Sequence, residues 1–215
     1  MKTRSACVIV CATALLATLL CPVPAIARPS GTLFQAPYQD TWAGDWSCAE
    51  TSEDEHEAAL IDAATGQIVL DMGTDSFLGS YDCQEAGAGA DFSHEVRGRK
   101  PLTIITTFDL VSASIKPDPT DPTGGNQPRS DARLRSFAVT QDGTYLSGAE
   151  ETVVSYGGDA PESTSARTVV ISYTLDGLTP GQEVLIIAGA EGWLTSNWGT
   201  STLDLEARLV SVEVR

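Results

Sequence analysis

The chain has 215 residues, of which 42% are hydrophobic and 20% are charged, and its formal net charge at pH 7 is −16. So acidic a surface repels nucleic acid and anionic lipid, and we expect neither as a partner. The negative charge favours solubility, and it also suits cationic partners or divalent ions.

Residues 1–27 have the pattern of an export signal. Lys2 and Arg4 form a short positive region, residues 6–20 are almost wholly apolar, and the AIA sequence at 25–27 is a cleavage site. The apolar run is shorter than the ~20 residues that a membrane span needs. We therefore predict a secreted chain of residues 28–215 with no membrane span after cleavage.

The cysteines fit an exported protein. Five are present, and removal of residues 1–27 leaves Cys48 and Cys83, which we predict to form one disulfide. Free thiols or metal ligands are the alternative, which the absence of a C-x-x-C spacing disfavours. A lipid anchor on Cys21 is disfavoured too, because Leu20 precedes it where lipidation signals have a small residue.

The first half of the mature chain predicts two kinds of segment. Residues 28–47 are rich in Pro, Gly and aromatic residues and read as an extended N-terminal arm or an irregular first strand. Residues 50–66 allow either a short capped helix or a hairpin that turns at 64–66, and the flanking Val, Ile and Leu favour the hairpin. Residues 84–91 (QEAGAGAD) are predicted to form a flexible loop.

The second half predicts strands. The strongest β signal is 102–115, with apolar residues on both faces, followed by a Pro-rich loop at 116–131. Four shorter strands follow, and a last strand closes the chain. In the last strand the apolar positions change parity, which predicts a β-bulge near Leu209 and Val210. The other predicted strands are 132–140, 151–156, 167–175 and 183–190.

This pattern of short strands and frequent turns predicts an all-β fold. We expect an antiparallel β-sandwich, jelly-roll or immunoglobulin-like, with at most one short helix. Residues 48–215 would form a single domain.

The segment LDGLTPGQEV at 175–184 resembles the turn between two late strands of fibronectin type III and related immunoglobulin-like domains. In such a turn Leu178 plugs the base of the sandwich, Pro180 sets φ, and Gly181 supplies a positive φ. The family places a corner tyrosine where this sequence has Val184. Jelly-roll modules contain similar turns, so the resemblance implies a β-sandwich and no functional residues.

Motifs for several reaction classes are missing, and we assign no catalytic residue. The sequence has no G-x-S-x-G, no phosphate-binding Gly-rich loop, and two histidines, His56 and His94, which we expect to face solvent. No cofactor is expected. Calcium is the ion that Asp118, Asp121 and Asp131 would suit, although solvated loop carboxylates are the favoured interpretation.

The segment GAEGWLTSNWGTS at 189–201 reads as a loop with two tryptophans. Trp193, Asn197 and Trp198, beside Glu191, have the chemistry of a sugar-binding platform, in which rings stack and polar groups bind hydroxyls. The alternative is that the two indoles cap an open end of the sandwich, since Trp is largely buried on average.

The sequence therefore predicts a secreted, non-enzymatic β-sandwich that binds or adheres to an extracellular carbohydrate or to a surface protein. A β-sandwich hydrolase with paired carboxylates is one alternative. A structural envelope protein without a small ligand is the other.

The predicted disulfide can be tested directly. Reduction should lower the free energy of unfolding of residues 28–215 by ~3–4 kcal/mol, because a cross-link restricts the unfolded chain. Urea unfolding with and without a reductant measures this difference. Two thiols that react with Ellman's reagent in the unreduced, unfolded protein would contradict the prediction.

Overall fold

The computed structural model describes residues 40–47, 56–75, 82–116, 130–157, 162–196 and 200–215. These residues form ten strands and no helix. The strands, in chain order, are β1 (Asp40–Ser47), β2 (His56–Ile61), β3 (Gln67–Asp75), β4 (Asp82–Glu95), β5 (Leu102–Lys116), β6 (Ser130–Thr140), β7 (Tyr145–Tyr156), β8 (Ser163–Leu175), β9 (Glu183–Ser196) and β10 (Thr200–Val214).

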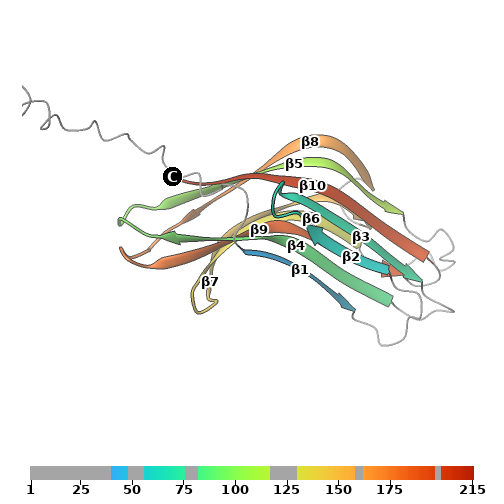
Figure 1. Cartoon of the computed structure of the whole chain (residues 1–215), viewed down its shortest axis with the longest axis horizontal. Coiled ribbons are helices and arrows are strands. Elements are labelled where there is room, and N and C mark those ends of the chain that lie inside the picture. The colour runs from blue at the N-terminus through green and yellow to red at the C-terminus, as the bar shows by residue number, and fades with distance from the viewer. Residues whose placement is uncertain (1–39, 48–55, 76–81, 117–129, 158–161, 197–199) are drawn as a thin grey trace, which may run out of the picture. The chain divides into compact units, whose positions relative to one another are not determined.

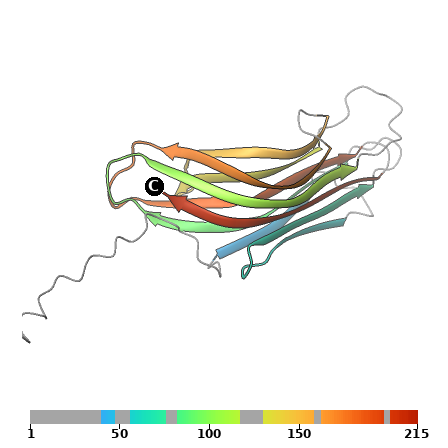
Figure 2. The ribbon, with the colours of Figure 1, turned by 90° about the horizontal axis from the view of Figure 1, so that it is seen from above.

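Two five-stranded antiparallel sheets pack face to face, as Figures 1 and 2 show. One has the order β1-β4-β9-β6-β7, and we call it the site sheet. The other has the order β2-β3-β10-β5-β8, and we call it the opposite sheet. Without β1 and β2, the orders β4-β9-β6-β7 and β3-β10-β5-β8 are those of an eight-stranded jelly roll. The predicted β-sandwich is confirmed, and β1 and β2 extend one edge of each sheet.

The core lies between the sheets and is built by alternation along the strands. In β8 the predicted inward set is buried, and Leu178 in the following turn closes the same core. Gly181 has a φ of 85°, as the turn requires, and its N–H donates to the carbonyl of Val96 at 2.8 Å. The inward residues of β8 are Val169, Ile171, Tyr173 and Leu175.

Three local predictions can be compared with the strands. β2 and β3 pair antiparallel across a turn at 62–66, which confirms the hairpin and excludes the helix at 56–66. The predicted bulge is present, because the pairing of β10 with β5 shifts between Leu209 and Ser211. The third prediction was that residues 102–115 carry apolar side chains on both faces. The pairing of β5 with β10 skips Val111, so the parity changes there and the apolar residues before and after it face the same core.

The predicted loop at 84–91 is wrong, because these residues lie in β4. The alanines of this segment point into the core, while Gly87 and Gly89 point outward beneath the indole of Trp42 from β1. Gly89 also lies directly opposite Gly189 of β9. The alternating small residues of this segment therefore belong to a strand. Their size leaves room for the Trp42 ring and for the close approach of β9.

Several predictions concern residues that lie partly or wholly outside the described ones. Residues 1–39 are outside them, so the export signal and most of the N-terminal arm stay predictions. Residues 40–47 of the arm are the edge strand β1. Cys83 is buried at the start of β4, whereas Cys48 lies outside the described residues, and the disulfide stays a prediction. In the described part of the chain, no helix is long and apolar enough to cross a membrane.

The glycine patch yields a stability prediction. A Cβ at Gly89 would lie 2.4 Å from the carbonyl oxygen of Ala188 and 2.8 Å from the Trp42 ring. We expect Gly89→Val to lower the free energy of unfolding by about 2–4 kcal/mol, because backbone and ring must both move. Urea unfolding measures the loss, with the exposed Gly98→Ala as the control, since a Cβ there meets nothing within 4 Å. Equal stability of the two variants would contradict this packing.

Candidate functional site

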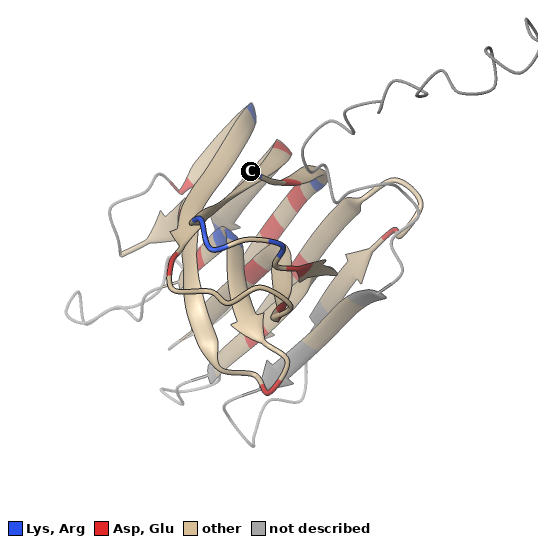
Figure 3. Ribbon diagram, turned by 90° about the vertical axis from the view of Figure 1, so that its left-hand side faces the viewer, with Lys and Arg blue, Asp and Glu red and all other residues tan. Residues whose placement is uncertain are grey.

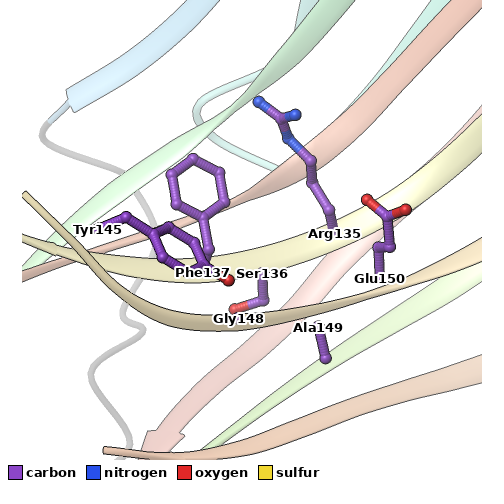
Figure 4. Close-up of a pocket in the computed structure, with 7 residues that line it drawn as sticks. All are labelled: Arg135, Ser136, Phe137, Tyr145, Gly148, Ala149 and Glu150. Atoms are coloured by element: carbon purple, nitrogen blue, oxygen red, sulfur yellow. The ribbon is translucent and has the colours of Figure 1, made fainter.

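The outer face of the site sheet carries a hollow of about 450 Å³ across β6 and β7. Figure 4 shows its side chains, with the rings of Phe137 and Tyr145 near one another and with Arg135 and Glu150 farther along the same strands. The full lining is Arg135, Ser136, Phe137, Tyr145, Gly148, Ala149 and Glu150.

A β-bulge places Tyr145 on this face. Phe137 pairs with Gly148, and Ala138 pairs with Ser147, but Val139 then pairs with Tyr145, so β7 has an extra residue at Leu146. Without that residue the alternation along β7 would turn Tyr145 toward the core. With it, Tyr145 is 62% exposed, and its ring centroid lies 6.4 Å from that of Phe137.

Gly148 keeps the floor of the hollow open. A Cβ at this position would lie 2.4 Å from the Cβ of Phe137 and 2.9 Å from its Cα. Any larger residue would therefore displace the Phe137 backbone or side chain. The sequence predicted strands at 132–140 and 151–156, whereas β7 already begins at Tyr145.

Beneath the hollow, three hydroxyl groups cross the core. Thr106 of β5 donates to the Oγ of Ser136 at 2.8 Å, and Ser136 donates to the Tyr173 hydroxyl at 3.4 Å. Burial raises the pKa of Tyr173 to about 12, so this phenol stays neutral at physiological pH. The hydroxyls join β6 to the opposite sheet and hold the strand that carries Arg135 and Phe137.

Charged side chains continue the site across β6 and β9. Arg133 donates to both carboxylate oxygens of Asp131, at 2.6 Å and 3.0 Å, and to Glu150 at 3.1 Å. Arg135 donates through Nη1 to Glu191 of β9, and its Cζ lies 5.0 Å from the centre of the Phe137 ring. A guanidinium over an aromatic face is attracted by the ring's quadrupole.

Glu191 has an unusual electrostatic environment. Burial, above all, and a hydrogen bond with the carboxyl group of Glu85 raise the pKa of Glu191 to about 7, against the opposing charges of Arg135 and Arg133. Two carboxyl groups in contact share a proton more readily than they both ionise. Glu191 therefore changes charge near neutral pH while it contacts Arg135.

The structure locates part of the predicted ligand site. Trp193 does not lie in a loop: it is in β9, opposite Glu85 of β4 and Asp131 of β6. It is half-buried and has the parity of Glu191, so it is on the outer face of the site sheet and outside the core. Asn197 and Trp198 lie outside the described residues, so their place in a site stays a prediction.

Of the three candidate calcium ligands, the structure describes one. Asp118 and Asp121 lie outside the described residues. Asp131 lies in β6, is 3% exposed, and is bound by Arg133. No group of three or more His, Cys, Asp or Glu in the described part of the chain is arranged to hold a metal ion. His94, expected to face solvent, is half-buried with the parity of Phe92, and burial lowers its pKa.

Sequence reasoning missed most of the hollow. Phe137 was part of a predicted strand, but Tyr145 lay between two predicted strands, and no contact between the two rings was predicted. A signal was present, because the short QDG segment at 141–143 between two alternating runs is typical of a hairpin. The bulge that turns Tyr145 outward has no comparable signal in the sequence.

No family model and no curated protein matches this chain. Among solved structures, a protein described as "CBM4 structure and function" matches 86% of this chain and 100% of its own at 8% identity, with a TM-score of 0.37. Bacteriophage CBA120 tailspike protein 4 matches 83% of this chain and 21% of its own, at 12% identity and a TM-score of 0.30. Isomalto-dextranase of Arthrobacter globiformis T6, complexed with panose, matches 80% and 33%, at 14% identity and a TM-score of 0.24. None of these similarities assigns the chain to a family.

The environment of Glu191 makes stability depend on pH. Because its pKa in the folded protein is about 7, above the ordinary value of 4.5, its contribution is fully present at low pH and is lost as pH rises through 7. We expect Glu191→Gln to match the wild type at pH 4, below both pKa values, and to exceed its free energy of unfolding by about 3 kcal/mol at pH 8.5. Urea unfolding at both pH values measures this, with Glu206→Gln on the opposite sheet as the control. A difference between Glu191→Gln and wild type that is independent of pH would be inconsistent with this titration.

Proposed function

We propose that this chain is a carbohydrate-binding β-sandwich and that the hollow on the site sheet holds the sugar. The observation that carries the proposal is the pair of adjacent rings, Phe137 and Tyr145, which line an open hollow together with Arg135 and Glu150. Binding sites for small polar ligands combine an apolar or aromatic wall with a few placed polar groups. A sugar ring offers an apolar C–H face to an aromatic ring and hydroxyls to charged side chains.

The position of the rings favours a bound chain rather than a single sugar. The hollow is open along a sheet face that continues past Arg135 and Glu191 to Trp193 on β9. A polysaccharide lying across the strands would contact the Tyr145 and Phe137 rings at one end and Trp193 at the other. The location of Trp193 on the same face as the hollow supports its predicted role in binding.

We propose further that the protein acts outside the cell, as the export pattern of residues 1–27 predicts. Along the described ribbon, Asp and Glu occur at more positions than Lys and Arg, as Figure 3 shows. An acidic surface keeps an exported protein soluble and favours neutral or cationic polymers over acidic ones. A surface protein is the alternative partner, to be distinguished by the experiment below.

The hydrolase alternative receives less support from the geometry. On the outer face of the site sheet, the carboxyl groups of Glu85 and Glu191 are joined by a hydrogen bond. Retaining glycosidases separate their two carboxyl groups by ~5–5.5 Å and inverting ones by ~6.5–9.5 Å, to make room for the sugar or for water. Carboxyl groups in direct contact leave no such room, so this pair favours binding over hydrolysis.

The test is retention of residues 28–215 on insoluble cellulose, xylan, chitin and cell-wall preparations, with calcium and with a chelator. We expect retention on at least one polymer, and we expect Tyr145→Ala to weaken it about tenfold or more, as loss of a central aromatic contact does. Tyr145 is 62% exposed, so its removal should leave the fold intact. Trp193→Ala, measured beside it, tests whether the bound polymer extends along the sheet.

Val170→Ala is the matched control, because Val170 is 58% exposed on β8 of the opposite sheet. It should bind as the wild type does. If Tyr145→Ala is retained as strongly as Val170→Ala, the hollow is excluded as the site. The predicted residues Asn197 and Trp198 would then be the next candidates. The absence of binding to every polymer would exclude the carbohydrate proposal and favour a protein partner or a structural role.

A further inference from the structure

Arg135 lines the hollow, but its position is set from outside the hollow. Its Nη1 donates to Glu191 on the neighbouring strand β9, and its Cζ lies 5.0 Å from the centre of the Phe137 ring. Its Nε is buried and has no acceptor among the described residues. The carboxylate of Glu191 is therefore the partner that fixes where the guanidinium lies.

Glu191 has two partners that require different charge states. The ionised carboxylate accepts a charge-assisted hydrogen bond from Arg135. The protonated carboxyl can instead donate to Glu85 of β4, with which it already shares a hydrogen bond. Protonation of Glu191 therefore removes the ionic part of its attraction to Arg135 and strengthens its hydrogen bond with Glu85.

The charged groups that face Glu191 come from two strands. Glu85 lies on β4, and Arg135 and Arg133 lie on β6. Arg133 is occupied by Asp131 and Glu150, which leaves Arg135 as the cation in direct contact with Glu191. Glu191 is 20% exposed at its side chain and Arg135 is 29% exposed, so solvent screens the pair only in part.

We propose that Glu191 is a positioning residue of the hollow: its ionised carboxylate holds Arg135 beside Phe137 for ligand contact, and its protonation releases Arg135 and weakens binding. This inference rests on the proposed carbohydrate site and adds its regulation by pH. Because the pKa of Glu191 is about 7, the change falls between about pH 6 and pH 8. Binding should be strong at the alkaline end of this range and weak at the acidic end.

The first experiment measures the affinity of the folded chain for cellohexaose, xylohexaose, hexa-N-acetylchitohexaose and maltohexaose from pH 5.5 to pH 8.5. For a hexasaccharide that binds, we expect the affinity to rise about three- to tenfold with pH, the effect of one charge-assisted contact that is partly lost. Glu191→Gln should bind with no dependence on pH over this range. Glu206→Gln, the same change on the opposite sheet, should keep the wild-type profile.

A further variant separates positioning from a general effect of charge. Glu85→Gln removes the carboxyl group that shares the proton, so the pKa of Glu191 should fall and the midpoint of the binding profile should move to lower pH. A merely structural role of Glu191 would change the affinity without moving a midpoint. A Glu85→Gln profile with an unmoved midpoint would overturn the inference.

The second experiment needs no sugar. The NMR signal of the Arg135 Nε–H group should titrate with a midpoint near pH 7 in the wild type and should not titrate in Glu191→Gln. If the Arg135 signal does not change with pH near 7 and the protein still binds a hexasaccharide, the inference is overturned and the proposed function stands. An Arg135 signal that follows it, with no hexasaccharide bound at any pH, would overturn the proposed function and the pH-dependent binding with it.

Discussion

Alternation of side chains along each strand, and the few bulges that shift it, decide which residues of this protein meet solvent. A strand has a period of two, so one inserted residue moves every later side chain to the other face. β10 uses this at Val210, where the core set changes parity, and β5 uses it at Val111. β7 uses it at Leu146, and there the shift turns an aromatic ring outward. The core and the candidate site thus depend on the same device.

The outward turn of Tyr145 matters because of what lies next to it. Tyr145, Phe137, Arg135 and Glu191 form a continuous series of contacts that crosses from β7 through β6 to β9. Each of these strands is held from below by the core, and β6 is joined to the opposite sheet through Ser136 and Thr106. A binding surface built on strands is more rigid than one built on loops, which lowers the entropy cost of ordering it for a ligand.

The sequence predicted most of the architecture, because local signals and the fold agree in those places. The hairpin at 56–75, the bulge near Leu209 and the plug at Leu178 each follow from turn chemistry or from the parity of apolar residues. The same reasoning failed at 84–91 and at 189–196, where Gly and other residues common in turns suggested loops. Those residues are small because Trp42 and a close neighbouring strand need the space, and such neighbours come from positions distant in sequence. Trp193 lies in strand β9 and not in the predicted loop, and its role in binding stays a prediction.

The pairing of Glu191 with Glu85 and Arg135 could not be predicted from sequence, since it depends on the register of three strands. It also runs against stability. A carboxyl group whose pKa rises on folding lowers the free energy of unfolding once it ionises, so the protein would be more stable near neutral pH with a glutamine at this position. Residues that break a local rule without a gain in stability are most often found where a site needs them. Glu191 is such a residue, and it contacts Arg135 of the hollow. We therefore link the stability lost at Glu191 to the position of the Arg135 guanidinium rather than to the packing of the sandwich.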